Sequence, residues 1–156
     1  MSKVKLLLFV ILSAIFAVSV GFAAEKSFKA KLTGNDQVPS VTTKAKGDAK
    51  FKLSSDGKTL SYTLHVKNIE NPTAAHIHRG MKGKSGPPMV NLFTGPKKEG
   101  KFSGDLSAGT ITAKDLSGDL MGKSLDDLVK LIKSGDTYVN VHTDANPDGE
   151  IRGQIK

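Results

Sequence analysis

Residues 47–66 read GDAKFKLSSDGKTLSYTLHV, and this stretch decides the fold class. Apolar side chains take every second position on both sides of the tetrapeptide SSDG, namely Ala49, Phe51 and Leu53 before it and Leu60, Tyr62, Leu64 and Val66 after it. Alternation at period two turns one face of a strand toward a core, and Asp-Gly is a strong hairpin signal. The stretch therefore predicts two antiparallel strands joined by a tight turn.

Other short segments with strand character lie between turn residues along the rest of the chain. They cover residues 27–33, 74–78, 89–93, 102–106, 109–113, 137–143 and 150–155. Many short strands separated by turns are typical of sandwiches and barrels. We therefore predict an all-β domain that forms an antiparallel sandwich or a flattened barrel.

One segment departs from the alternation and has the period of a helix. Its apolar side chains are spaced by three or four residues, at Leu125, Leu128, Val129 and Ile132. Ser124 and Asp127 form a capping box in front of it, and Gly135 follows as a stop signal. The pattern predicts a helix of about ten residues, which is too short for a bundle and suits the end or side of a sheet.

The N-terminal segment, residues 1–23, has the layout of a secretory signal peptide. Lys3 and Lys5 precede an apolar run over residues 6–20, and Gly21 and Ala23 put small side chains at positions −3 and −1 of a cleavage site. We expect cleavage after Ala23, a mature domain of residues 24–156 without a transmembrane span, and a periplasmic or extracellular location. The alternative is an uncleaved N-terminal anchor.

Composition excludes several classes of protein. The 156 residues include no Cys, which rules out a disulfide scaffold, a thiolate nucleophile, an iron–sulfur cluster and a blue-copper site. Nucleophile elbows, phosphate loops and HExxH motifs are missing from the sequence as well. We therefore expect a non-catalytic protein unless a metal supplies the chemistry.

The net charge is positive, because residues 24–156 carry 21 basic and 15 acidic side chains, or +6. Lys44, Lys46, Lys50 and Lys52 recur at even spacing, which places them on one strand face. Neither a basic helix nor a row of exposed aromatic residues is apparent, so we predict no nucleic-acid partner. A solvated face is the favoured interpretation, and weak attraction to an anionic polymer of the cell envelope stays open.

The four histidines lie on strand faces opposite to the core. His76 and His78 are two residues apart and share a face, while Ile77 points the other way. His142 lies on the polar face of a later strand, and His65 on that of an earlier one. Imidazole ligands without sulfur suit Cu(II), Zn(II), Ni(II) or Fe(II), and copper stands highest in the affinity order. The pattern predicts a metal site at His76, His78 and His142, with His65 as a fourth candidate; histidines that are merely exposed or hydrogen-bonded are the alternative.

A polar turn follows His142 and allows two interpretations. Asp144, Asn146 and Asp148 followed by Gly149 match the first half of a calcium-binding EF-hand loop. The twelfth position of such a loop is Ile155 instead of Glu, so a hairpin turn is favoured. After the turn, Glu150 and Arg152 could form ion pairs with neighbours, and Arg152 could alternatively draw an anion toward the metal.

Three stretches together resemble the CHRD domain, first named from the extracellular protein chordin. They are AHIHRG at residues 75–80, GPPMV at 86–90 and YVNVHTDANPDGEIRGQI at 138–155. The resemblance runs from about residue 27 to the C-terminus. It implies a β-rich fold related to the Greek-key barrel of copper/zinc superoxide dismutases, in a family found in secreted bacterial proteins as well as in chordin. It implies no single biochemical activity.

The looser likeness to the dismutases bears on the metal. His76, His78 and His142 occupy places similar to those of the copper ligands in those enzymes, but no zinc loop follows His78 and no disulfide is possible. The expectation is thus an exported binding module with a His-based copper site. The alternatives are a structural or protein-interaction module of the cell envelope without metal, and a copper-dependent enzyme that acts on reactive oxygen species.

Overall fold

The computed structural model describes residues 26–156, and in this part of the chain eight β-strands form the domain. The predicted signal peptide at residues 1–23 lies outside the described residues. The strands are β1 (Lys26–Thr33), β2 (Lys46–Leu53), β3 (Leu60–Glu70), β4 (Pro72–Arg79), β5 (Pro88–Phe93), β6 (Lys101–Ile111), β7 (Thr137–Thr143) and β8 (Ile151–Gln154). Three 3₁₀ turns, Gly34–Asp36, Ala113–Asp115 and Gly118–Leu120, and one α-helix, α1 (Leu125–Lys133), complete them. The predicted all-β class is confirmed.

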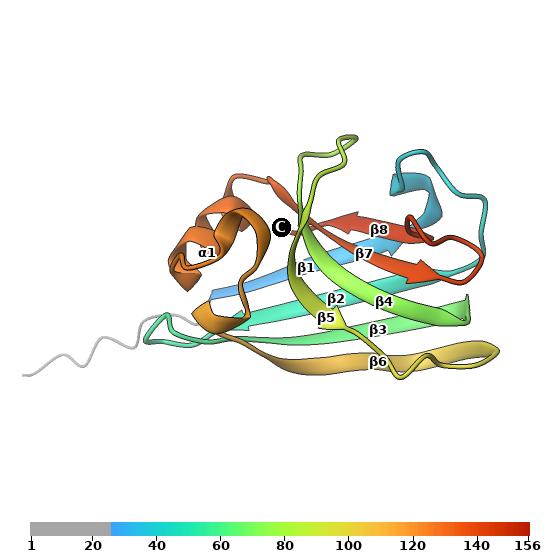
Figure 1. Ribbon diagram of the computed structural model, residues 1–156, viewed down its shortest axis with the longest axis horizontal. Helices are drawn as coiled ribbons and strands as arrows, with labels where there is room; N and C mark the ends of the chain where they lie inside the picture. Colours follow the sequence, from blue (N-terminus) through green and yellow to red (C-terminus); the bar gives the residue numbers. More distant parts are fainter. Residues whose placement is uncertain (1–25) are drawn as a thin grey trace, which may run out of the picture.

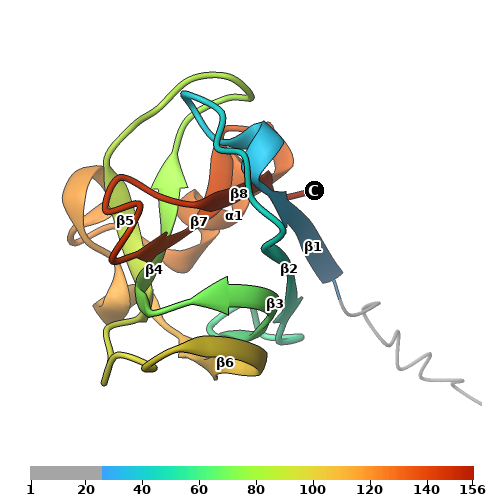
Figure 2. The ribbon, with the colours of Figure 1, turned by 90° about the vertical axis from the view of Figure 1, so that its right-hand side faces the viewer.

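The strands form one antiparallel sheet in the order β5-β4-β7-β8-β1-β2-β3-β6, and the sheet curls until its two edges meet (Figures 1 and 2). At the closing edge, the Ser107 hydroxyl of β6 donates a hydrogen bond of 2.5 Å to the Leu92 carbonyl of β5. With β6 beside β5, strands β3 to β6 have the Greek-key order, in which the first strand lies next to the last. The molecule is the flattened barrel that the sequence predicts.

The hairpin predicted from residues 47–66 is present as β2 and β3. Phe51 pairs with Tyr62 and Ala49 with Leu64, so the alternating apolar side chains share the inner face. Gly57 has a φ of +71° in the turn, a conformation that costs glycine little. The inner faces of all the strands contribute to one continuous core.

Helix α1 covers one end of the barrel, as Figure 1 shows. Ser124 accepts from the backbone N–H of Asp127, and the Asp127 carboxylate accepts from the Ser124 N–H, so the predicted capping box exists. Four side chains on one face of the helix are buried, namely Leu125, Leu128, Val129 and Ile132. Because these are the residues that the sequence spaced for burial, the helix and its position are both confirmed.

The prediction of separate strands at residues 102–106 and 109–113 was wrong. Both segments belong to the single strand β6, which pairs with β3 from Leu60↔Ile111 to Glu70↔Lys101. The ladder shifts register on either side of Val66, and Asn68 adopts a φ of +53° in the second irregularity. Such bulges bend a strand without ending it, and one sequence does not reveal them.

No helix in residues 26–156 has both the length and the hydrophobicity needed to cross a lipid bilayer.

Candidate metal centre

Strands β4 and β7 bring three histidines together on the outer face of the barrel. The two strands pair so that His76 lies opposite Asn140 and Ala74 opposite His142. His76, His78 and His142 all point away from the core, because Ile77 and Val141 take the inward positions between them. The alternation of the two strands therefore places imidazoles from positions far apart in sequence on one surface.

The three rings are close enough to share one metal ion. One nitrogen of each lies within 4.8 Å of the others, and His76 Nδ1 is 3.1 Å from His142 Nε2. A tetrahedral metal with bonds of about 2.0–2.1 Å separates its nitrogen ligands by roughly 3.3 Å. Small ring movements would thus bring all three nitrogens to coordinating positions.

Backbone carbonyls fix the tautomers of two of these rings. His78 Nδ1 lies 2.9 Å from the carbonyl oxygen of Gly86, and His142 Nδ1 lies 2.8 Å from that of Pro147. Since a carbonyl can only accept, each Nδ1 carries the hydrogen and each neutral ring keeps a lone pair on Nε2. His142 Nε2 then accepts from His76 Nδ1, and His78 Nε2 is buried without a hydrogen-bond partner.

The site favours uncharged imidazoles, which is the form that binds metals. Burial is the main cause that lowers the pKa of His76 to about 4, and the neighbouring His142 and His78 lower it further. Burial also lowers the pKa of His78, against the opposing effect of its bond to Gly86. At neutral pH His76 and His78 therefore present lone pairs without having to lose a charge-bearing proton first.

A stack of three side chains supports His78 from the side. Its ring lies parallel to that of Tyr138, with an interplanar angle of 12° and a centroid distance of 5.0 Å. The guanidinium carbon of Arg152 lies 3.4 Å from the centre of the same tyrosine ring. Tyr138 also accepts a hydrogen bond from the Gly86 N–H, so the residue that orients His78 is itself held.

Arg152 contributes in a way that the sequence did not reveal. Its side chain is only 2% exposed and donates to the carbonyl oxygens of Met81 and Lys84, at 3.0 and 2.7 Å. These bonds hold the loop of residues 80–87 over the outer face of β7 and β8. Glu150 accepts hydrogen bonds from the hydroxyls of Thr43 and Thr143, and neither Glu150 nor Arg152 forms the ion pair considered for it with another of residues 26–156. The alternation of Ile151 and Ile155 with polar residues puts Arg152 on the outer face, but nothing in the local sequence indicates the loop that covers it.

His65 lies away from the three other histidines. It is on β3, which β7, β8, β1 and β2 separate from β4 in the sheet order. Its Nδ1 is 2.9 Å from a carboxylate oxygen of Asp105, and 41% of its side chain is exposed. The structure thus brings three of the four predicted ligands together, and His65 makes a surface contact with a carboxylate.

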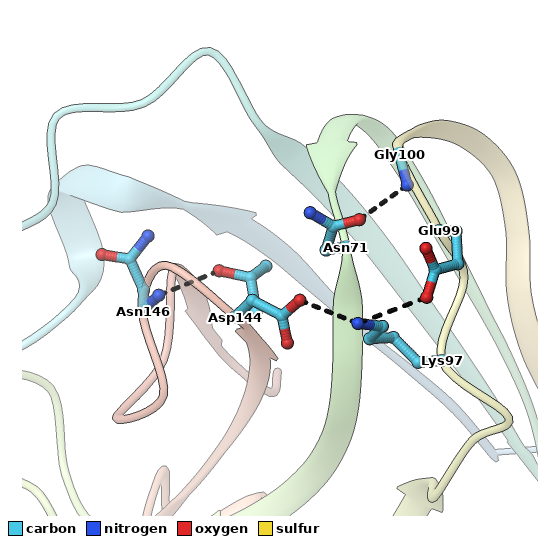
Figure 3. A network of polar contacts seen from close by, with 7 residues as sticks. Asn71, Lys97, Glu99, Gly100, Asp144 and Asn146 are labelled. Carbon is cyan, nitrogen blue, oxygen red and sulfur yellow. Dashed lines mark hydrogen bonds and ion pairs between the residues drawn. The ribbon is translucent and has the colours of Figure 1, made fainter.

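The polar turn after His142 has the character of a hairpin connection. Figure 3 shows the Asp144 carboxylate directed at the Lys97 ammonium, 3.0 Å away, which also contacts Glu99 at 3.4 Å. The Asn146 side chain points elsewhere and donates to Glu150. These oxygens do not converge as in an EF-hand loop, and the turn instead supplies the Pro147 carbonyl that orients His142.

The fold and the three clustered imidazoles define an all-β domain whose outer face could hold a metal ion. The CHRD domain family model matches residues 28–155, so the chain belongs to the CHRD domain family. A comparison with curated proteins found no match, and a comparison with solved structures found none. The family and the cluster together support a binding module.

Proposed function

We propose that this protein is an exported metal-binding domain that holds one copper ion through His76, His78 and His142. The observation that carries the proposal is the buried Nε2 of His78, which has no hydrogen-bond partner and belongs to a cluster with two other imidazoles. A buried polar atom without a partner costs about 1–3 kcal/mol. A metal bound at this atom would remove that cost.

The donor set fits copper among the metals considered. It consists of nitrogen alone, without thiolates, and Cu(II) binds imidazole sites more tightly than the other divalent first-row metals. The Gly86 and Pro147 carbonyls supply the outer hydrogen bonds that metal-binding histidines usually have. When bound, the ion would take the place of the hydrogen bond between His76 Nδ1 and His142 Nε2, and the His76 hydrogen would move to Nε2, so uptake by the neutral ring would release no net proton.

Export is part of the same proposal. CHRD domains occur in extracellular or secreted proteins, and residues 1–23 have the layout of a signal peptide. A copper site in a periplasmic or extracellular protein would bind the metal outside the reducing cytosol. We assign the site a binding role because the candidate metal group among residues 26–156 consists of three imidazoles and includes no carboxylate that could act as a general base.

Titration calorimetry with Cu(II) tests the site, using the protein purified without a His tag. We expect one ion per chain, and a binding heat at pH 7 that depends little on the buffer, because His76 and His78 are already neutral. The double variant His76→Ala, His78→Ala should lose the binding, because only one imidazole remains. His65→Ala should bind as the parent does, since His65 is on another part of the barrel.

Two results would overturn the proposal. If the double variant takes up as much Cu(II) as the parent, the three histidines are not the ligands. If the parent protein binds no Cu(II) although its circular dichroism spectrum shows a folded β-protein, the domain is instead a structural or protein-interaction module. If copper-loaded protein removes superoxide faster than free copper does, the alternative of a copper-dependent enzyme is favoured.

A further inference from the structure

A second surface lies outside the histidine cluster, and most of its charged residues are lysines. On the outer face of β1 and β2, Lys29 pairs directly with Lys50, and Ser27 pairs with Lys52. These lysines are exposed, while Ala30 and Phe51 on the same strands are buried. Like charges placed opposite each other on a sheet repel, so the arrangement costs stability unless something offsets it.

Two adjoining hollows are formed at this surface. The first, of about 660 Å³, lies across β1, β2 and β3, and Lys29, Lys50, Lys52 and Lys156 line it. The second, of about 430 Å³, lies toward the loop of residues 80–87, and its lining includes Lys31 and Lys82. Lys29 and Lys156 line both, so the hollows form one continuous basic tract.

Negative side chains are scarce in the two hollows themselves, although Asp48 pairs with Lys31 on the neighbouring strand and, with Asp105, lines a further hollow that shares Lys50. Asp36, which lies 4.0 Å from Lys82, is the single carboxylate side chain among the residues that line the two hollows. Six exposed lysines line the two hollows, namely Lys29, Lys31, Lys50, Lys52, Lys82 and Lys156. Such a concentration of one sign of charge in a hollow attracts a polyvalent anion much more strongly than a single small ion.

The remaining lining indicates which kind of polyanion fits. Ser27, Ser61 and Thr63 place hydroxyl groups in the first hollow, where they can bond to the hydroxyls of a sugar. Phe28, Phe51 and Tyr62 also line the first hollow, but they pack against the core, so they offer no open platform for stacked bases. The large exposed apolar residues among 26–156 are Val38, Met81 and Met121, and none of them lines the tract, so it has no wedge for a membrane.

We propose that this lysine tract on the outer face of β1, β2 and β3 binds an acidic polysaccharide. The lysines would neutralise its carboxylate or sulfate groups, and the hydroxyls would contact its sugar rings. The two hollows lie side by side, so the ligand is a chain and not a single sugar. The proposal does not depend on the metal, because none of the three clustered histidines lines either hollow.

Binding to dextran sulfate and polygalacturonate, with neutral dextran as the control polymer, tests the proposal. We expect the full chain to bind both acidic polymers and not dextran, with an affinity that falls as NaCl rises. The double variant Lys29→Glu, Lys50→Glu should lose about tenfold or more in affinity. It replaces one pair of like charges on neighbouring strands by another, so the repulsion between the side chains at residues 29 and 50 stays similar.

A matched variant separates the tract from net charge. Lys114→Glu with Lys123→Glu changes the net charge by the same amount at two exposed positions that line neither hollow. It should keep nearly all of the affinity, and Cu(II) uptake should be the same in both variants. Three results would each overturn the proposal. They are an equal loss of affinity in the two variants, binding to neutral dextran, and tighter binding to single-stranded DNA or phosphatidylglycerol vesicles than to either acidic polysaccharide.

Should the Glu variant fail to fold, Lys29→Gln with Lys50→Gln removes the charges without reversing them and is expected to weaken binding in the same direction.

Discussion

His76 and His78 make the stability of the metal-free protein depend on pH. The pKa of His76 is lowered to about 4 in the folded state, from an ordinary value of 6.5, mainly by burial. Between these two values the unfolded chain binds more protons than the folded one, so stability is complete above pH 6.5 and falls as the pH drops toward 4. The pKa of His78 is lowered too, and its contribution has the same sign.

We expect the free energy of unfolding, measured with urea in the presence of a chelator, to decrease by about 1–2 kcal/mol between pH 7 and pH 5, after allowance for the partial exposure of His76. Carboxylates also titrate in acid, so the variant His76→Gln is the reference. The slope between pH 5 and 7 should be shallower in that variant. A variant with the same slope as the parent would mean that His76 does not cause the dependence.

At the scale of elements, the loop of residues 80–87 completes the surroundings of His78. It supplies the Gly86 carbonyl to His78, and Arg152 fixes it through the Met81 and Lys84 carbonyls. Gly86 is required at its position by close contact, because a Cβ there would lie about 2.0 Å from the Arg79 carbonyl oxygen. A side chain at residue 86 must therefore displace the loop.

The substitution Gly86→Ala should accordingly weaken Cu(II) binding by about 10–100-fold, the usual effect of removing the hydrogen bond that orients a metal-binding histidine. Gly83→Asn is the control in the same loop, since a Cβ at residue 83 meets no atom within 4 Å and Asn tolerates its φ of +77°. Calorimetric titration of both variants provides the measurement. Equal affinities in Gly86→Ala and the parent would show that the loop does not orient His78.

The sequence predicts some elements better than others, because some are specified by neighbouring residues and others by contacts between residues far apart in the chain. The β2–β3 hairpin and α1 are specified locally, by alternation with an Asp-Gly turn and by a capping box with helical spacing. Strand β6 was predicted as two pieces because its continuity depends on pairing with the distant β3. Alternation also placed His76, His78 and His142 on outer faces correctly. The carbonyls that fix their tautomers come from a loop and a turn, and no local pattern identifies those contacts.

For the whole molecule, two side-chain hydrogen bonds to one carbonyl oxygen join the closing edges of the barrel. Strands β5 and β6 are the two edges of the sheet, and the Leu92 carbonyl on β5 accepts from both the Tyr62 hydroxyl, at 2.7 Å, and the Ser107 hydroxyl, at 2.5 Å. An isolated bridge between Val90 and Leu116 adds backbone pairing nearby. Unpaired edges invite association with other strands, so these side-chain bonds protect the sheet edges as well as joining them.

This arrangement predicts a nonadditive effect on stability. Tyr62→Phe and Ser107→Ala should each cost about 1 kcal/mol or less, because the remaining hydroxyl still satisfies the Leu92 carbonyl. The double variant leaves that carbonyl without either side-chain partner in a residue only 3% exposed, so it should cost more than the sum of the two, by about 1 kcal/mol. Urea unfolding of the four proteins measures the coupling.

Cu(II) affinity should stay constant across the four proteins, because the edge that the substitutions alter lies at β5 and β6 while the ligands are on β4 and β7. Strict additivity would mean that backbone packing closes the barrel without these hydroxyls.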